Sequence, residues 1–264
     1  MSDKASACRT DPSPQWPRAD DLDSVALLLD VDGTILDIAT TPSGVVVPAT
    51  LRRSLRQLHR KTGGALALVS GRRIGNLDLL FAPLRLPAIG GHGAEMRISG
   101  DCSAQSRSGA AIGESVRREI AAMAADDPRI IIEDKGSSLA VHYRLAPNRG
   151  PALNSEIAAL LDRRASDRLE AISGKAVIEI KPQSFDKGSA VLDLMKIPPF
   201  ANRRPFFIGD DTTDEAVFAV LPMLDGRGYS VERVISGTNG TFGSPREVRS
   251  WLGHLSARGG TDSQ

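Results

Sequence analysis

Two aspartates, Asp30 and Asp32, stand two residues apart directly after the apolar run Ala26–Leu29, and Gly33 and the hydroxyl donor Thr34 follow them. Four apolar residues in a row predict a buried strand, and ligands bind at the carboxyl end of such a strand in an α/β sheet. Carboxylates this close repel each other unless a cation lies between them or one holds a proton. An Asx-rich turn that caps a helix would also explain a bare DxD pair. The complete pattern, a strand followed by DxDGT, favours a nucleophile for phosphoryl transfer.

A second acidic group follows the apolar stretch Phe206–Ile208. Asp210 stands where this predicted strand stops, Asp211 follows it, and Asp214, four residues after Asp210, lies near the start of the next helix. Acidic residues at the start of a helix complement its dipole, but residues 210–215 contain four carboxylates, more than that role needs. A hard cation would neutralise the negative charge of these carboxylates. Mg²⁺ suits such a site because it accepts one or two carboxylates, a phosphate oxygen and several waters.

Two further stretches carry groups that suit a phosphoryl oxygen. Ser70 and Gly71 follow the apolar run Ala65–Val69, and a serine hydroxyl together with the next backbone amide can donate to an anion. Ser70 fits equally well as the N-cap of a helix through Leu80, and the two roles are compatible because a helix N-terminus binds anions. Lys187 opens a later helix, where its point charge would hold nucleophile and phosphate together if it faced the site.

These residues can meet only if the strands before them lie in one sheet. The two aspartate motifs and Ser70 each follow an apolar run and precede a predicted helix, an alternation typical of a parallel α/β sheet. Over 109–182 the order changes to helix, strand, strand, helix, strand, strand, which predicts a small α+β unit with an antiparallel sheet. A unit inserted between two strand-rich halves suits a cap that excludes water. We therefore predict an α/β fold, a Rossmann-like parallel-sheet core with an inserted α+β cap domain.

The predicted organisation has five parts. In chain order they are a disordered lead-in at 1–20, a first core part at 21–108, the cap at 109–182, a second core part at 183–257 and a flexible tail at 258–264. The lead-in is polar and contains prolines, although a docked arm that uses Trp16 is an alternative. His92, which lies in a cluster of glycines, and the loop at 236–243 receive no role.

The composition is that of an ordinary soluble protein. Of 264 residues, 41% are hydrophobic and 25% are charged. A net charge of +1 and an aromatic content of 4% give no reason to expect nucleic acid or an anionic membrane as a partner. No apolar stretch is long enough to span a bilayer, we expect no secretory signal, and Cys8 and Cys102 are not expected to form a disulfide framework. We expect a monomeric, cytoplasmic enzyme that acts on a small molecule.

The ordered motifs together resemble the haloacid-dehalogenase-like (HAD) phosphohydrolase superfamily, in a match that covers about residues 22–255. The motifs are DVDGT, VSGR, Lys187-Gly188 and GDDTTDE. A narrower resemblance is to the trehalose-6-phosphate phosphatases. It rests on the segments GHGAE (91–95), EDKG (133–136), HYR (142–144), GKAVIE (174–179) and GDDTTDE (209–215).

The resemblance implies a Mg²⁺-dependent phosphatase that hydrolyses trehalose 6-phosphate in trehalose biosynthesis. Asp30 would attack phosphorus to form an aspartyl-phosphate, and Asp32 would protonate the departing sugar oxygen and later activate water. The residues implied fall into three groups. Mg²⁺ would be held by Asp30, Asp210 and the backbone carbonyl of Asp32, with Asp211 and Asp214 in support; phosphoryl oxygens would contact Thr34, Ser70, Gly71 and Lys187; the disaccharide would contact Glu133, Lys135, Arg144, Lys175 and Glu179.

Three alternatives stay open at this point. The same mechanism could serve another sugar phosphate, such as sucrose phosphate or a glucosyl- or mannosyl-glycerate phosphate, because cap chemistry decides the sugar. A mutase shares the first motif, although the disaccharide-like cap segments argue against it. A catalytically silent sugar-phosphate-binding module would be expected to lack the nucleophile or a metal carboxylate, yet Asp30 and Asp210 are both present.

Overall fold

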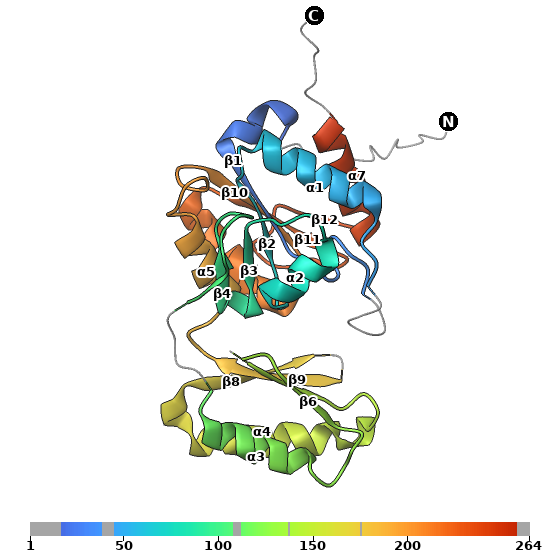
Figure 1. Cartoon of the computed structure of the whole chain (residues 1–264), viewed down its shortest axis with the longest axis vertical. Helices are drawn as coiled ribbons and strands as arrows, with labels where there is room; N and C mark the ends of the chain where they lie inside the picture. The colour runs from blue at the N-terminus through green and yellow to red at the C-terminus, as the bar shows by residue number, and fades with distance from the viewer. Residues whose placement is uncertain (1–16, 39–44, 108–111, 137, 175, 258–264) are drawn as a thin grey trace, which may run out of the picture. The chain divides into compact units, whose positions relative to one another are not determined.

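A computed structural model describes residues 17–38, 45–107, 112–136, 138–174 and 176–257 (Figure 1). The chain divides into two compact units, Met1–Ala67 with Met195–Gln264 and Leu68–Leu194, and the division passes through β2 (Leu66–Val69). Residues 1–16 of the predicted lead-in, Trp16 included, and the whole predicted tail lie outside the described residues. The 3₁₀ helix η1 (Ala19–Ser24) begins within the last part of the predicted lead-in. The predicted domain boundaries stay predictions.

Among the described residues, the larger sheet has eight strands in the order β12-β11-β10-β1-β2-β3-β4-β5. It is mostly parallel, as predicted, and its antiparallel pairs are β3 with β4 and β4 with β5. Besides β2, its strands are β1 (Val25–Leu29), β3 (Ala88–Gly90), β4 (Glu95–Arg97), β5 (Gln105–Ser106), β10 (Arg204–Gly209), β11 (Arg227–Val231) and β12 (Gly240–Phe242). The predicted fold class is therefore confirmed.

The strands β1 and β10 lie at the centre of the first unit. They pair in parallel, with Leu29 beside Ile208. Every residue of β1 is buried, which explains why the sequence shows an unbroken apolar run there and no alternation. Phe206 of β10 stacks on both Tyr229 and Trp251, with ring centroids 5.2 Å apart in each pair. This packing fixes β10, the strand that precedes Asp210.

Helices α1 (Ala49–Lys61) and α7 (Pro245–Ala257) pack against each other in the same unit (Figure 1). The leucines that recur at helical spacing in α1, at positions 51, 55 and 58, are buried. Lys61 Nζ donates to the carbonyl of Ser256 at 2.7 Å and ties the two helices together. A shorter helix, α6 (Glu215–Val220), follows the acidic segment after β10.

In the second unit, α2 (Ile74–Phe81) follows β2. The alternative of Ser70 as its N-cap is wrong, because the helix begins at Ile74 with Arg73 in the N-cap position. The carboxylate of Glu95, which lies on β4, accepts the amide of Ile74 at 2.8 Å. Glu95 therefore caps the helix in place of a side chain at the N-cap position. The sequence also does not predict β5, since its two residues are polar and exposed. Lys187 opens α5 (Lys187–Leu194), as predicted.

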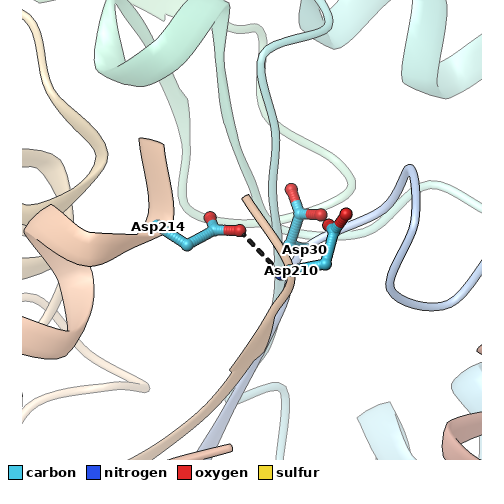
Figure 2. A group of neighbouring side chains, drawn as sticks. All are labelled: Asp30, Asp210 and Asp214. Atoms are coloured by element: carbon cyan, nitrogen blue, oxygen red, sulfur yellow. Dashed lines mark hydrogen bonds between the residues drawn. The ribbon is translucent and has the colours of Figure 1, made fainter. Parts of the chain in front are cut away.

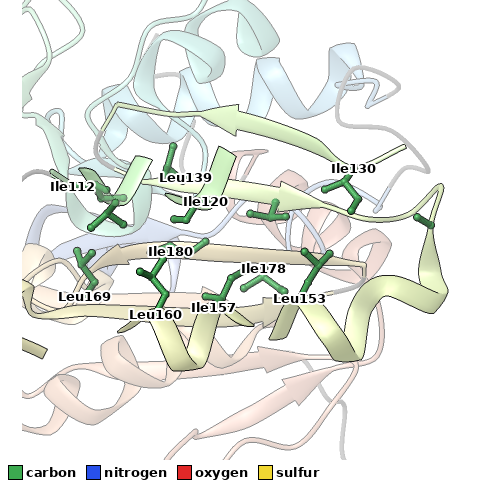
Figure 3. Packing of buried hydrophobic residues seen from close by; sticks show 13 residues of the cluster. Ile112, Ile120, Ile130, Leu139, Leu153, Ile157, Leu160, Leu169, Ile178 and Ile180 are labelled. Atoms are coloured by element: carbon green, nitrogen blue, oxygen red, sulfur yellow. The ribbon is translucent and has the colours of Figure 1, made fainter. Parts of the chain in front are cut away.

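The second sheet is antiparallel, as predicted, and has the order β6-β7-β9-β8. Its strands are β6 (Ile131–Asp134), β7 (Leu139–His142), β8 (Leu169–Gly174) and β9 (Val177–Pro182). Helices α3 (Glu114–Ala124) and α4 (Gly150–Arg163) cover one face of it (Figure 1). Figure 3 shows the apolar side chains between helices and sheet, among them Ile120, Ile157 and Ile178.

The other face of this antiparallel sheet carries charged side chains among apolar ones. Glu133, Ala140 and Glu179 stand in one row across β6, β7 and β9. Residues paired in register point to the same face of a sheet, and the buried neighbours Val141 and Ile178 of the apolar cluster point to the opposite one. The sheet therefore presents carboxylates on the face away from its helices.

The remaining elements are short 3₁₀ helices: η3 (Gly91–Gly93), η4 (Pro147–Arg149), η5 (Ala165–Asp167), η6 (Thr212–Asp214) and η7 (Leu221–Leu224). In the part of the chain that the structure describes, no helix has the length and apolar character that crossing a membrane requires.

Candidate active site

Asp30 and Asp210 lie side by side at the carboxyl ends of two neighbouring strands. The amide of Asp30 donates to the carbonyl of Ile208 in the adjacent strand at 2.9 Å. Parallel pairing of β1 with β10 places both carboxyl groups at the same edge of the sheet, and Figure 2 shows them next to each other. Asp30 is only 4% exposed, and Asp210 is half-buried. The two aspartates singled out from separate motifs thus come together.

Asp214 completes a group of three carboxylates. It is the last residue of η6 and is fully buried. Its Oδ2 accepts the backbone amides of Asp210 and Asp211, both at 3.0 Å, and Figure 2 shows the first of these bonds. One oxygen from each of Asp30, Asp210 and Asp214 lies within 4.8 Å of the others. We call these three residues the acidic group.

The charges of the acidic group act against each other. Burial and, after it, repulsion from Asp214 outweigh the opposing hydrogen bonds with Thr34 and Asp30, and together these effects raise the pKa of Asp210 to about 6. The hydroxyl of Thr34 donates to Asp210 Oδ1 at 3.0 Å. Crowded, buried carboxylate oxygens suit a hard divalent cation, whose charge would offset this repulsion. The acidic group therefore fits a divalent metal ion.

Gly33 leaves the room that the acidic group needs. Its φ is +82°, and a Cβ there would lie 2.1 Å from Asp210 Oδ2. We expect Gly33→Ala to lower the free energy of unfolding by about 2–4 kcal/mol in urea denaturation, because it adds a left-handed backbone penalty and a clash. Gly237→Ala is the matched control, with φ +84° and nothing within 4 Å of the added Cβ. Equal losses in the two variants would show that the clash with Asp210 is unimportant.

The other two aspartates of the predicted metal site lie in different surroundings. Asp32 is partly exposed and forms an isolated bridge with Leu36. Asp211 is exposed and is the N-cap of η6, where its side chain accepts the amide of Thr212 at 2.7 Å. Within the described residues, neither belongs to the acidic group.

The second unit carries the other residues that we predicted to bind phosphoryl oxygens. Ser70 follows β2 and is buried, and its Oγ accepts the amide of Arg72 at 3.1 Å. Because the hydroxyl is the acceptor there, its own hydrogen remains for another partner. Because Gly71 has no side chain, the imidazole ring of His92 can lie against it: a Cβ at position 71 would lie 2.3 Å from His92 Nε2. Lys187, at the start of α5, is buried.

Glu179 of β9 lies among polar side chains. Lys135 Nζ is 3.0 Å and His92 Nε2 is 3.3 Å from its Oε2, and the hydroxyl of Ser138 donates to its Oε1 at 2.7 Å. Burial raises the pKa of Glu179, but the hydrogen bond with His92, the charges of His92 and Lys135, and the bond from Ser138 outweigh burial and lower this pKa to about 2. Glu179 is therefore ionised at neutral pH and held in one orientation.

The structure brings together only part of the set predicted to bind the sugar. Lys135 and Glu179 are in contact. Glu133 shares a sheet face with Glu179, and its Oε2 lies 3.0 Å from His142 Nε2. Arg144 is exposed, and Lys175 lies outside the described residues.

Three residues for which the sequence predicted no role are in contact with predicted site residues. His92 and Ser138 contact Glu179, and Arg233 Nε donates to the backbone carbonyl of Asp210 at 2.8 Å. The glycines around His92 are the one signal in the sequence, because they indicate close packing. Ser138 lies just after the EDKG segment but outside it, and Arg233 belongs to none of the quoted segments, so neither was singled out.

The fold matches that of a solved phosphatase domain. The C-terminal domain of trehalose-6-phosphate phosphatase from Candida albicans superposes on this chain with a TM-score of 0.78. The match covers 90% of this chain and 94% of that domain, and at 23% identity it concerns the fold alone.

Sequence comparisons identify the family. A family model described as trehalose-phosphatase matches residues 28–244. A probable trehalose-phosphate phosphatase of Sinorhizobium fredii is 46% identical, over 78% of this chain and 77% of the relative. The trehalose-6-phosphate phosphatase of Escherichia coli is 37% identical, over 86% of this chain and 85% of the relative. The chain therefore belongs to the trehalose-phosphatase family, and the expected HAD-like fold and enzyme class, a phosphoric monoester hydrolase, are confirmed.

Proposed function

We propose that this chain hydrolyses trehalose 6-phosphate to trehalose and inorganic phosphate through an aspartyl-phosphate on Asp30. The observation that carries the proposal is the acidic group at the ends of β1 and β10 in a member of the trehalose-phosphatase family. The name of the Escherichia coli relative gives trehalose 6-phosphate as the substrate of that protein. We further propose that the chain acts as a cytoplasmic monomer, without nucleic acid or membrane as a partner.

The proposed reaction has two displacements at phosphorus. A carboxylate oxygen of Asp30 bonds to phosphorus while the bond to the sugar oxygen breaks, and Asp32 gives that oxygen its proton. Water then bonds to phosphorus, Asp32 takes the proton of the water, and the bond to Asp30 breaks to release phosphate. The surroundings of the two residues support Asp30 as the nucleophile and Asp32 as the acid and base. Asp30 is buried, whereas Asp32 is partly exposed and can exchange protons with solvent.

Mg²⁺ is the proposed metal ion. Asp30, Asp210 and the backbone carbonyl of Asp32 would hold it, and when bound it would neutralise negative charge on the transferred phosphoryl group. Asp214 supports this arrangement by accepting two backbone amides of the same loop. Asp211 supports it as the N-cap of η6.

Four residues are proposed to contact the phosphoryl oxygens. Thr34 and Ser70 would donate hydroxyls, Gly71 a backbone amide and Lys187 an ammonium. Thr34 already bonds to Asp210, so its hydroxyl links the phosphoryl site to the acidic group. Substitution of Lys187 removes a charge and is therefore expected to affect turnover more than loss of either hydroxyl.

Sugar recognition is proposed to rest on residues in and around the antiparallel sheet, which would act as the cap. The proposed residues are Glu133, Lys135, Arg144, Lys175 and Glu179. Carboxylates accept and ammonium or guanidinium groups donate, so together they suit the hydroxyls of a disaccharide. The contacts of Glu179 with Lys135 and Ser138 support it as the best-ordered acceptor of the set.

We expect Glu179→Gln to lower kcat/KM for trehalose 6-phosphate about 10–100-fold and to change that for p-nitrophenyl phosphate less than about threefold, because only the disaccharide uses remote binding energy. Steady-state kinetics on both substrates make the comparison. Glu156→Gln is the matched control, since Glu156 lies on α4 and pairs with Arg149 at 3.9 Å. A similar loss on both substrates would contradict a role in sugar recognition.

The proposed function is tested by phosphate release from a panel of sugar phosphates, with and without Mg²⁺, and with Asp30→Asn as the blank. We expect a strong preference for trehalose 6-phosphate and a need for Mg²⁺. Preference for sucrose phosphate or a glucosyl- or mannosyl-glycerate phosphate would keep the mechanism and overturn the sugar assignment. A folded wild type that turns over none of them would instead indicate a binding module.

A further inference from the structure

We infer that Arg233 is a positioning residue for the acidic group, a role that rests on the proposed function. Its Nε donates to the backbone carbonyl of Asp210 at 2.8 Å. Its Nη2 lies 3.4 Å from Oε1 of Glu215, the first residue of α6. Arg233 thus contacts the chain on both sides of η6, the turn that ends in Asp214.

The backbone around Arg233 explains how its side chain reaches Asp210. Strand β11 runs parallel to β10 and ends at Val231 on the same edge of the sheet. Glu232 then adopts a left-handed conformation with φ +62°, and the amide of Arg233 donates back to the carbonyl of Val231 at 2.7 Å. This tight turn keeps Arg233 beside the end of β10. A left-handed residue other than glycine costs energy and persists only where its surroundings hold it.

Arg233 and Asp214 hold the main chain of Asp210 from two directions. Asp214 Oδ2 accepts the amide of Asp210 at 3.0 Å, and Arg233 donates to the carbonyl of the same residue. The guanidinium contact is with the backbone, so it orients the Asp210 carboxylate without consuming an oxygen of the acidic group. Partners of this kind orient metal ligands before the ion binds and so raise metal affinity.

The test follows thermal unfolding of the full chain against Mg²⁺ concentration, without substrate. We expect Arg233→Ala to raise the Mg²⁺ concentration at half-maximal stabilisation about tenfold, because partners of metal ligands typically change affinity by about 10–100-fold. Arg233→Lys keeps the positive charge but replaces the planar guanidinium, which has several donors, by a single ammonium group. Its Mg²⁺ affinity should therefore lie between those of Arg233→Ala and the wild type. In kinetics, the Mg²⁺ requirement should rise about tenfold while kcat at saturating Mg²⁺ stays within about threefold.

Arg204→Ala is the matched control. Arg204 lies at the opposite end of β10, where its Nε contacts the carbonyl and a carboxylate oxygen of Asp225 at 3.2 and 2.8 Å. The Mg²⁺ midpoint of this variant should stay within about twofold of the wild type, because a surface ion pair contributes little.

The possible results separate this role from the proposed function. If the wild type responds to Mg²⁺ but Arg233→Ala has an unshifted midpoint, or Arg204→Ala shifts equally, the role of Arg233 is refuted and the metal site stands. If the wild type itself shows no response to Mg²⁺, the metal site and the role of Arg233 both fail. Should Arg233→Ala not fold, an unshifted midpoint in Arg233→Lys overturns the inference.

Discussion

Replacing Asp30 by asparagine is expected to reduce phosphate release from trehalose 6-phosphate by about 10⁴-fold or more, because Asp30 is the group that bonds to phosphorus. Asparagine has nearly the shape of aspartate, and the bond from the amide of residue 30 to the carbonyl of Ile208 involves only the backbone. The fold should therefore survive, and the loss should appear in kcat. Phosphate release at saturating substrate and Mg²⁺ measures it, with circular dichroism as the check on folding.

Asp37→Asn is the matched control for this variant. Asp37 lies in the segment after β1, is 73% exposed in its side chain and pairs with Arg249 at 3.1 Å. Its loss should change turnover less than about twofold, because exposed ion pairs contribute little. A folded Asp30→Asn protein that kept more than about 1% of wild-type turnover would require another nucleophile and would refute the proposed mechanism.

Replacing Asp210 by asparagine is expected to have the second-largest effect. The variant loses one of the proposed carboxylate ligands, so turnover should fall about 10²–10³-fold, as when other charge-stabilising groups are removed. Without this ligand, Mg²⁺ should no longer stabilise the protein against unfolding. Asparagine can still accept the hydroxyl bond from Thr34, which now reaches Oδ1 of Asp210 at 3.0 Å, so the local structure should be retained.

The same variant should be more stable than the metal-free wild type at neutral pH. Burial and repulsion from Asp214 raise the pKa of Asp210 from 3.8 to about 6. The folded protein therefore binds this proton more tightly than the unfolded chain does, and ionisation of Asp210 opposes folding. The destabilisation is absent below about pH 4, grows as the pH rises toward about 6, and is complete above that value. It corresponds to on the order of 1–3 kcal/mol.

Denaturation in the presence of a chelator, at pH 4 and at pH 7.5, checks whether ionisation of Asp210 destabilises the folded protein. Asp210→Asn should match the wild type at the lower pH and exceed it at the higher pH. Asp211→Asn serves as the control. Asp211 is exposed, its charge is the smallest of the contributions to the pKa shift of Asp210, and asparagine caps a helix as well as aspartate does, so stability should change little at either pH. An Asp210→Asn protein that is less stable than the wild type at pH 7.5 would contradict the repulsion within the acidic group.

The central residues were predictable because their signal is local. Asp30 and Asp210 each end an apolar run, and the carboxyl ends of parallel strands meet at one edge of a sheet. Their proximity follows from the pairing of β1 with β10, with Leu29 beside Ile208. The apolar runs predict that such strands exist, but the register between distant segments is decided by packing.

The distinction between Asp211 and Asp214 could not be predicted from residue types. Both are aspartates in the same acidic segment, and the 3₁₀ turn decides which is buried. Asp214 accepts two amides and joins the acidic group, whereas Asp211 points to solvent as an N-cap. A boundary of one or two residues in a short helix is the least predictable feature of a sequence.

The contacts of Glu179 were also out of reach of the sequence. The resemblance assigned Lys135 and Glu179 to one function, but their contact depends on the order of the strands in the antiparallel sheet. His92 and Arg233 belong to other elements, and their contacts with Glu179 and Asp210 arise only in the folded chain. Long-range contacts of single side chains leave no period or spacing in the sequence.

An aspartyl-phosphate on Asp30 should be trapped when the Asp32→Asn variant is mixed with radiolabelled p-nitrophenyl phosphate and quenched with acid. This substrate has a good leaving group and needs little help from an acid, whereas hydrolysis of the intermediate lacks its base. We expect label to accumulate on the peptide that contains Asp30, and we expect the double variant with Asp30→Asn to carry none. Label on another peptide, or single-turnover phosphate release by Asp32→Asn with no labelled protein at any quench time, would contradict an aspartyl-phosphate on Asp30.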